Sequence, residues 1–143
     1  MAAVSKATAH WEGGLDDGRG TAKVDSGAIP EVEVTWARRV ERTEGTTSPE
    51  ELLAAAHAAC FCMAFSHQLG QDGNPPESLD CAVSVEFVPG EGVTSSSIEI
   101  RGRVPELDQA GFEQAAQTAH ENCPISGALR GNVEMSVQAT LES

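Results

Sequence analysis

Alternation of apolar and polar residues near the start of the chain predicts three strands. The segments "ATAHWEG" (7–13) and "GTAKVDS" (20–26) flank a Gly/Asp-rich stretch, which indicates a β-hairpin. The segment "EVEVTWARRVE" (31–41) then places Val32, Val34 and Trp36 on one face of a third strand.

The segment "TTSPEELLAAAHAACFCMAFSHQLG" (46–70) changes to a helical pattern. Ser48 is an N-cap, Pro49 occupies the first helical position and Glu51 completes a capping box, while Gly70 ends a helix roughly 30 Å long. The residues between Leu52 and Phe65 are apolar or small on all sides, which is typical of a helix buried on every face. Because a chain of this size has little apolar material to surround such a helix, we expect a dimer.

The remainder of the chain predicts two strands, a helix, a short helical turn and a last strand. The strands "SLDCAVSVEFV" (78–88) and "SSSIEIRGRV" (95–104) flank the turn "PGEG", and Asp108 caps the second helix. The residues at helical spacing in that helix are Phe112, Ala115, Ala116 and Ala119. The turn "NCPISGALRG" (122–131) precedes the strand "NVEMSVQATLE" (132–142). This order predicts a single α+β domain over residues 1–143, with a mainly antiparallel sheet.

The formal net charge of −13 narrows the choice of partners. A chain this acidic repels phosphate backbones and anionic lipid, and it has no cluster of Lys and Arg, so we expect neither a nucleic-acid nor a membrane partner. The N-terminus lacks the apolar region of a secretory signal, which predicts a cytoplasmic protein.

Four cysteines carry the candidate chemistry: Cys60, Cys62, Cys81 and Cys123, with no CxxC motif among them. Cys81 shares the apolar face of its strand and is expected to be a packed core thiol. Cys60 and Cys62 are two residues apart, which on a helix is a rotation of about 200°, so they point to opposite sides and cannot bond to each other.

Cys123 precedes Pro124 and therefore occupies a helix N-cap, where free N–H groups lower the pKa of a thiol. The alternative is a cap residue without chemistry. A metal site is a further alternative, because His57 precedes Cys60 by three residues, as His120 precedes Cys123, and the four side chains are zinc ligands. The spacing between the two pairs matches no usual zinc module.

Three motifs resemble the OsmC/Ohr family of osmotically inducible protein C and organic hydroperoxide resistance proteins. They are "AHWEG", "GTTSPEELLAAAHAACFCMA" and "NCPISGAL", in the order and spacing of that family across nearly the whole chain. The "HWEG" and "HAACF" forms favour the OsmC branch. The resemblance implies an OsmC-like intertwined homodimer, with bent, mainly antiparallel sheets around long central helices.

The resemblance also implies a thiol-dependent peroxidase without a cofactor or metal. Its substrates would be organic hydroperoxides and, less efficiently, hydrogen peroxide. Carried over, Cys60 is the peroxidatic cysteine and Cys123 the resolving cysteine, and the two would form a disulfide. A dithiol, with a lipoylated protein as one candidate, would then reduce it. A non-catalytic redox-sensing or metal-binding dimer that uses the same cysteines is the alternative function.

An arginine and a glutamate complete the site of the family. The glutamate matches Glu50, which lies ten residues before Cys60, or about 15 Å along a straight helix, so it is expected to come from the partner subunit. The arginine of the OsmC pattern matches Arg39, although strand alternation favours Arg38 and the Ohr arrangement corresponds to Arg19.

Cys62 departs from the family, in which serine is common at this position. It is expected to be an inert core thiol, with an incidental oxidation site as the alternative.

Overall fold

The computed structural model describes residues 1–142, and the chain divides into two compact units between Pro49 and Glu50. The two are described separately below as the N-terminal unit and the C-terminal unit. The single domain that the sequence predicts over residues 1–143 stays a prediction.

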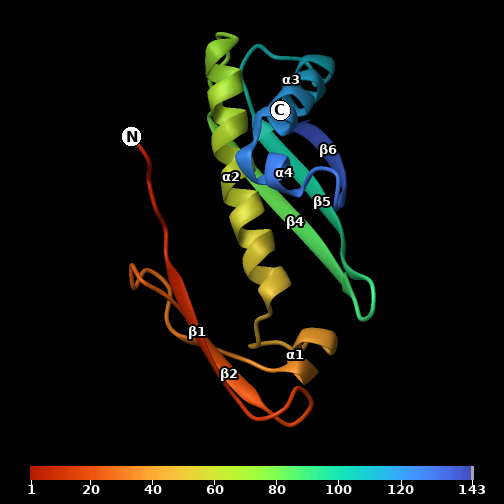
Figure 1. Cartoon of the computed structure of the whole chain (residues 1–143). Helices are drawn as coiled ribbons and strands as arrows, with labels where there is room; N and C mark the ends of the chain where they lie inside the picture. Colours follow the sequence, from red (N-terminus) through yellow and green to blue (C-terminus); the bar gives the residue numbers. More distant parts are fainter. Residues whose placement is uncertain (143) are drawn as a thin grey trace. The chain divides into compact units, whose positions relative to one another are not determined.

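The N-terminal unit is built on a three-stranded antiparallel sheet in the order β1-β2-β3 (Figure 1). Its strands are β1 (Ala7–Glu12), β2 (Arg19–Val24) and β3 (Val32–Val34), so the predicted hairpin is confirmed. Gly20 lies where β1 comes closest, because a Cβ atom there would be only 2.5 Å from the His10 carbonyl oxygen. Only glycine leaves room for that approach.

The third strand is shorter than the sequence predicts. The chain leaves it after Val34 and enters helix α1 (Trp36–Val40), so the prediction that Trp36 continues the strand was wrong. Thr35 caps this helix, since its hydroxyl oxygen accepts a hydrogen bond from the Arg38 N–H at 3.2 Å. Because that cap satisfies a backbone donor locally, the chain can leave the sheet here. Arg38 and Arg39 therefore lie on a helix, where strand alternation does not apply.

Helix α2 (Pro49–Gln71) begins at the predicted residue and ends one residue beyond Gly70. Within a single chain it buries one stripe of side chains: Glu50, His57, Phe61, Phe65 and Leu69. The opposite side stays open, and Met63 is 71% exposed there. A single chain therefore leaves part of the helix uncovered, and burial on every face, which was expected of a dimer, stays a prediction.

Helix α2 also has the length and apolar composition of a membrane span. It is one helix among the described residues that is long and apolar enough to cross a membrane. The core helix of a soluble protein has the same length and composition. This finding is therefore weak evidence for a membrane.

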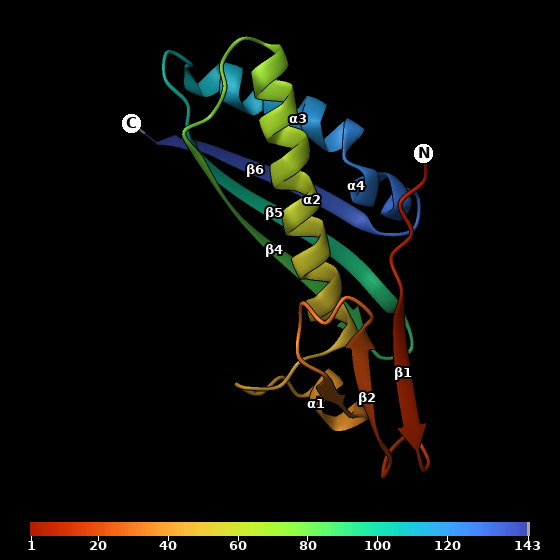
Figure 2. The same ribbon diagram turned by 90° about the vertical axis from the view of Figure 1, so that its left-hand side faces the viewer.

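A second three-stranded sheet forms the base of the C-terminal unit. Its strands are β4 (Ser78–Val88), β5 (Gly92–Arg103) and β6 (Glu134–Glu142), with β5 in the centre. The β4–β5 pair is antiparallel, as expected, but β6 pairs with β5 in parallel. A parallel neighbour needs a long crossover, and here helices α3 (Gln109–Asn122) and α4 (Pro124–Leu129) provide it (Figure 2).

The core of this unit lies between the sheet and the helices. Phe65 of α2 and Phe112 of α3 pack in a tilted arrangement with ring centroids 4.9 Å apart, and Ile98 and Ile100 of β5 belong to the same buried cluster. The predicted cap of α3 is confirmed, because the Asp108 carboxylate accepts a hydrogen bond from the Gly111 N–H at 2.8 Å. The predicted α+β class is thus confirmed. The intertwined homodimer stays a prediction.

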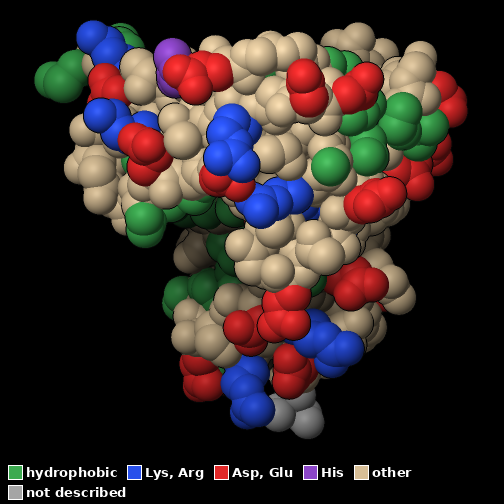
Figure 3. Space-filling model, turned by 90° about the horizontal axis from the view of Figure 1, so that it is seen from below, with side chains coloured by type: hydrophobic (Ala, Val, Ile, Leu, Met, Phe, Trp, Pro, Cys, Tyr) green, Lys and Arg blue, Asp and Glu red, His purple; other side chains and the backbone are tan. Residues whose placement is uncertain are grey.

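The surface carries acidic and basic side chains side by side. Figure 3 shows Asp and Glu interspersed with Lys and Arg over one face of the molecule.

Candidate functional site

The structure brings two of the predicted site residues together in the C-terminal unit. The Sγ atoms of Cys60, on α2, and Cys123, between α3 and α4, lie 3.5 Å apart. Cys123 is buried at 1% exposure, whereas Cys60 is only partly buried. An Sγ···Sγ distance of 3.5 Å is longer than a disulfide bond of about 2.05 Å, so the pair is a dithiol that a small movement could link.

The environment of Cys60 has opposing effects on its pKa. Burial has the largest effect and raises the pKa of the Cys60 thiol, and the neighbouring Cys123 raises it further. The backbone N–H of Ile125 donates a hydrogen bond to the Cys60 sulfur and lowers the pKa. Within this unit, burial prevails over the single stabilising hydrogen bond.

The first turn of α4 therefore lowers the pKa of Cys60, whereas the sequence favours an effect on Cys123. Cys123 is the N-cap residue of α4, as predicted, but its side chain makes no capping hydrogen bond. Ile125, the second residue of that helix, donates its N–H to Cys60 instead. The sequence could not show this contact, because it depends on how α4 packs against α2.

A buried network of two histidines and two serines lies one helical turn from both thiols. The His57 ring is 2.8 Å from Ser96 Oγ through Nδ1 and 2.8 Å from Ser126 Oγ through Nε2. The Ser126 Oγ is also 3.0 Å from Nδ1 of His120. His57, Ser96 and Ser126 are fully buried, and burial lowers the pKa of both histidines.

Sequence analysis identified the two histidines as candidate zinc ligands but missed their serine partners. One signal was present for Ser96, a polar residue that shares the buried face of Ile98 and Ile100 on β5. A buried hydroxyl on an apolar face needs a partner. Among residues 1–142, no group of three or more His, Cys, Asp or Glu is arranged to hold a metal ion.

The remaining two thiols, Cys62 and Cys81, lie next to each other. Cys62 interacts with Cys81 of β4, and Cys81 also feels the charge of Cys123. Burial raises the pKa of Cys62, and it raises the pKa of Cys81 to about 12. Both thiols are therefore protonated near neutral pH, and their lack of reactivity stays a prediction.

The other predicted site residues lie on three different elements, α2, α1 and β2. Glu50 is 6% exposed in the first turn of α2, about 15 Å along the helix axis from Cys60. Arg39 lies on α1 of the N-terminal unit and is partly buried, whereas Arg19 is exposed at the start of β2. Arg38 forms an ion pair with Glu33.

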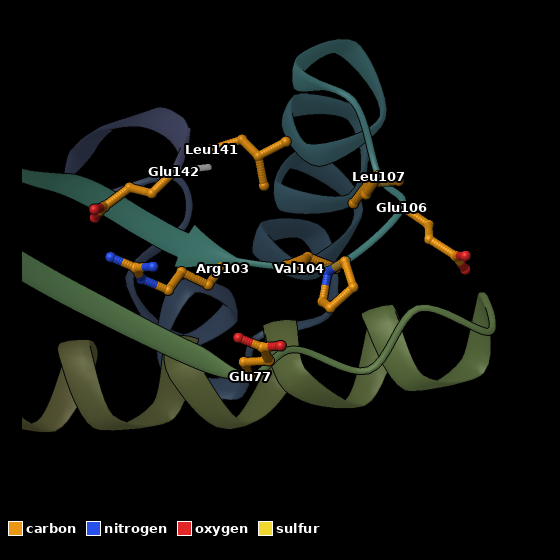
Figure 4. Close-up of a pocket in the computed structure, with 8 residues that line it drawn as sticks. Glu77, Arg103, Val104, Glu106, Leu107, Leu141 and Glu142 are labelled. Carbon is orange, nitrogen blue, oxygen red and sulfur yellow. The ribbon is translucent and has the colours of Figure 1, made fainter.

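A pocket of the C-terminal unit at the end of the second sheet differs from the thiol pair in the side chains that it offers (Figure 4). Its lining residues are Glu77, Arg103, Val104, Pro105, Glu106, Leu107, Leu141 and Glu142. It contains neither a cysteine nor a histidine, so it offers no nucleophile, and the thiol pair remains the candidate site.

Comparisons with known proteins agree on one family. Residues 42–138 match the OsmC-like protein family. The chain is 37% identical over 141 residues to Peroxiredoxin OsmC of Escherichia coli (strain K12), covering 96% of this chain and 98% of that protein. It is 38% identical over 95 residues to the organic hydroperoxide resistance protein of Xanthomonas axonopodis pv. citri (strain 306), covering 64% of this chain and 65% of that protein.

Solved structures show the same similarity. The crystal structure of an organic hydroperoxide resistance protein OsmC from Legionella pneumophila has a TM-score of 0.73 and 28% identity, with 98% of each chain covered. The OhrB structure of Bacillus subtilis has a TM-score of 0.70 and 26% identity, covering 96% of this chain and 98% of that chain.

Proposed function

This chain belongs to the OsmC-like protein family, and on that premise we propose that it is a cysteine-based peroxidase that reduces organic hydroperoxides. Hydrogen peroxide would be a poorer substrate. The observation that carries the proposal is the 3.5 Å approach of the Cys60 and Cys123 sulfur atoms. The names of the relatives, a peroxiredoxin and an organic hydroperoxide resistance protein, support a peroxide-related role.

The first chemical step uses Cys60 as a thiolate. The sulfur attacks the distal oxygen of the hydroperoxide, so that an S–O bond forms and the O–O bond breaks. The departing alkoxide takes a proton and leaves as the alcohol, and Cys60 becomes a sulfenic acid. The Ile125 N–H favours the thiolate that starts this step.

The second step uses Cys123, which is too buried to meet a bulky substrate directly. Its sulfur attacks the sulfenic acid sulfur of Cys60, an S–S bond forms, and the hydroxyl group leaves as water after taking up a proton. An external dithiol then reduces the disulfide by exchange and is itself oxidised. A lipoylated protein is the candidate reductant that the family resemblance provides.

The raised pKa of Cys60 requires a further favourable charge for activity near neutral pH. We assign that role to Arg39, whose guanidinium would favour the thiolate and hydrogen-bond the peroxide oxygens. Glu50 would orient the arginine, because a buried carboxylate needs a cationic partner.

The active unit in this proposal is a cytoplasmic homodimer. The exposed side of α2 is apolar, with Met63 at 71% and Leu52 at 36% exposure, along with small residues that allow close helix packing. A second copy would cover this side in a closed twofold contact. It would also allow Glu50 to reach a Cys60 of the other subunit, which the distance along one straight helix does not permit.

Steady-state consumption of cumene hydroperoxide tests the proposal. With dithiothreitol or dihydrolipoamide as reductant, we expect wild type to turn over and Cys60→Ser to lose activity. Cys123→Ser should reduce about one equivalent and then slow sharply with a dithiol. The matched control is Cys62→Ser, on the same helix, which should keep activity. An active Cys60→Ser variant, or an inactive Cys62→Ser variant, would contradict the assignment.

A further inference from the structure

Ser126 connects the three helices that surround the thiol pair. Its hydroxyl lies 2.8 Å from His57 of α2 and 3.0 Å from His120 of α3, while Ser126 itself belongs to α4. His57 precedes Cys60 by one helical turn, and His120 precedes Cys123 by the same spacing. One buried hydroxyl therefore contacts both of the turns that lead to the reacting sulfur atoms.

Two consecutive residues of α4 contact the same face of α2. Ser126 contacts the His57 ring at 2.8 Å, and the backbone N–H of the preceding residue, Ile125, lowers the pKa of the Cys60 thiol. Residues three apart on a helix share a face, so the two contacts lie one turn apart along α2. Together they fix both the position and the tilt of the first turn of α4.

The Ser126 hydroxyl is hard to replace, because the two histidine rings and this hydroxyl share few hydrogen-bond donors. Burial lowers the pKa of both histidines, so each ring is neutral near pH 7 and has one N–H donor and one acceptor nitrogen. The single Ser126 proton can go to only one of the two rings, and its oxygen accepts from the other. Removing the hydroxyl leaves two ring nitrogens without this partner, one of them on the fully buried His57.

We propose that Ser126 is a positioning residue, whose hydroxyl fixes the first turn of α4 so that the Ile125 N–H stays on the Cys60 sulfur and Cys123 stays within reach. Ser96 supports the arrangement from the sheet by holding the other side of the His57 ring at 2.8 Å. The catalytic importance of Ser126 rests on the proposed peroxidase function, but its effect on the Cys60 thiol can be tested without a peroxide.

The test is the pH dependence of alkylation at Cys60 in the full-length protein. Iodoacetamide rates are measured at each cysteine by peptide mass spectrometry, from pH 6 to pH 11. In Ser126→Ala we expect the Cys60 midpoint to move to higher pH and the rate at pH 7 to fall about tenfold, the scale of one lost hydrogen bond to a charged group. The plateau at high pH should be unchanged, which separates a loss of thiolate from a loss of access.

Three variants complete the design. Ser126→Thr keeps the hydroxyl and should restore most of the rate, and Ser136→Ala, at an exposed position of β6, should match wild type. If Ser126→Ala does not fold, as judged by circular dichroism, the alkylation rates of His120→Ala are measured instead. This substitution removes only the partly buried hydrogen-bond partner of Ser126. A slower Cys60 reaction with a higher midpoint supports the proposal. An unchanged Cys60 profile in a folded Ser126→Ala or, failing that, His120→Ala variant overturns it. Peroxide turnover is measured separately, so an inactive wild type would contradict the proposed function alone.

Discussion

Oxidation by one equivalent of an organic hydroperoxide should link Cys60 to Cys123 and stabilise the C-terminal unit. The two sulfur atoms need to approach by about 1.5 Å to form a disulfide from their separation of 3.5 Å. Cys62 and Cys81 should stay reduced, because the sulfur atom that lies 3.5 Å from Cys60 is that of Cys123.

The size of the stabilisation follows from the loop that the bond closes. The two cysteines are 63 residues apart in the sequence. The loss of chain entropy in the unfolded state corresponds to about 4 kcal/mol at 25 °C for a loop of this length. With a urea dependence of about 2 kcal/mol per M, the unfolding midpoint should rise by about 2 M.

Urea unfolding followed by far-ultraviolet circular dichroism is the appropriate assay. Both tryptophans, Trp11 and Trp36, lie in the N-terminal unit, so their fluorescence does not follow the unfolding of the C-terminal unit itself. The helical signal comes mainly from α2, α3 and α4. Protein concentration is held constant, because a dimer unfolds at a midpoint that depends on it.

The control is Cys123→Ser treated in the same way, which should show no such rise. Peptide mapping must confirm the bond before the midpoints are compared. A verified Cys60–Cys123 disulfide that leaves the midpoint unchanged would refute the entropy argument. A dominant bridge through Cys81 would refute the assignment of the pair.

Three further predictions address the charges around the site. Arg39→Ala should lower the thiolate absorbance of Cys60 at pH 7 and slow peroxide reduction more than Arg19→Ala does; the reverse order would indicate the Ohr arrangement. Mixing the weak variants Cys60→Ser and Glu50→Ala should restore activity in verified mixed dimers, because one of the two sites then keeps both groups; no recovery would contradict sharing across the interface. The free energy of unfolding should decrease as the pH falls below about 6.5, because burial lowers the pKa of His57 and the unfolded chain then binds that proton more tightly. Urea titrations at several pH values should show a smaller decrease in His57→Gln, and an equal decrease would assign the effect to other groups.

The parts of the fold that sequence analysis predicted correctly depend on local signals. Pro49 starts α2, and Asp108 caps α3, because capping chemistry acts within one turn. The helix that carries both Cys60 and Cys62 likewise follows from a local pattern. The approach of Cys60 to Cys123 came from family resemblance, since no local pattern relates residues so distant in the sequence.

The features that sequence analysis missed depend on tertiary contacts or on a competing local cap. Val32 and Val34 form the predicted strand, but the Thr35 cap ends it before the alternating pattern does. The parallel pairing of β6 depends on where α3 and α4 return the chain to the sheet. The contact between Ile125 and Cys60 requires two helices to meet, and no spacing in the sequence encodes it.

The most direct test of the central claim is to trap the first intermediate. A Cys123→Ser variant is mixed with one equivalent of cumene hydroperoxide in the presence of dimedone, and each cysteine is examined by mass spectrometry. Our account predicts a dimedone adduct on Cys60, one equivalent of cumyl alcohol, and neither product in a Cys60→Ser, Cys123→Ser double variant. An adduct on Cys62 or Cys81 in place of Cys60, or alcohol formation by the double variant, would contradict it.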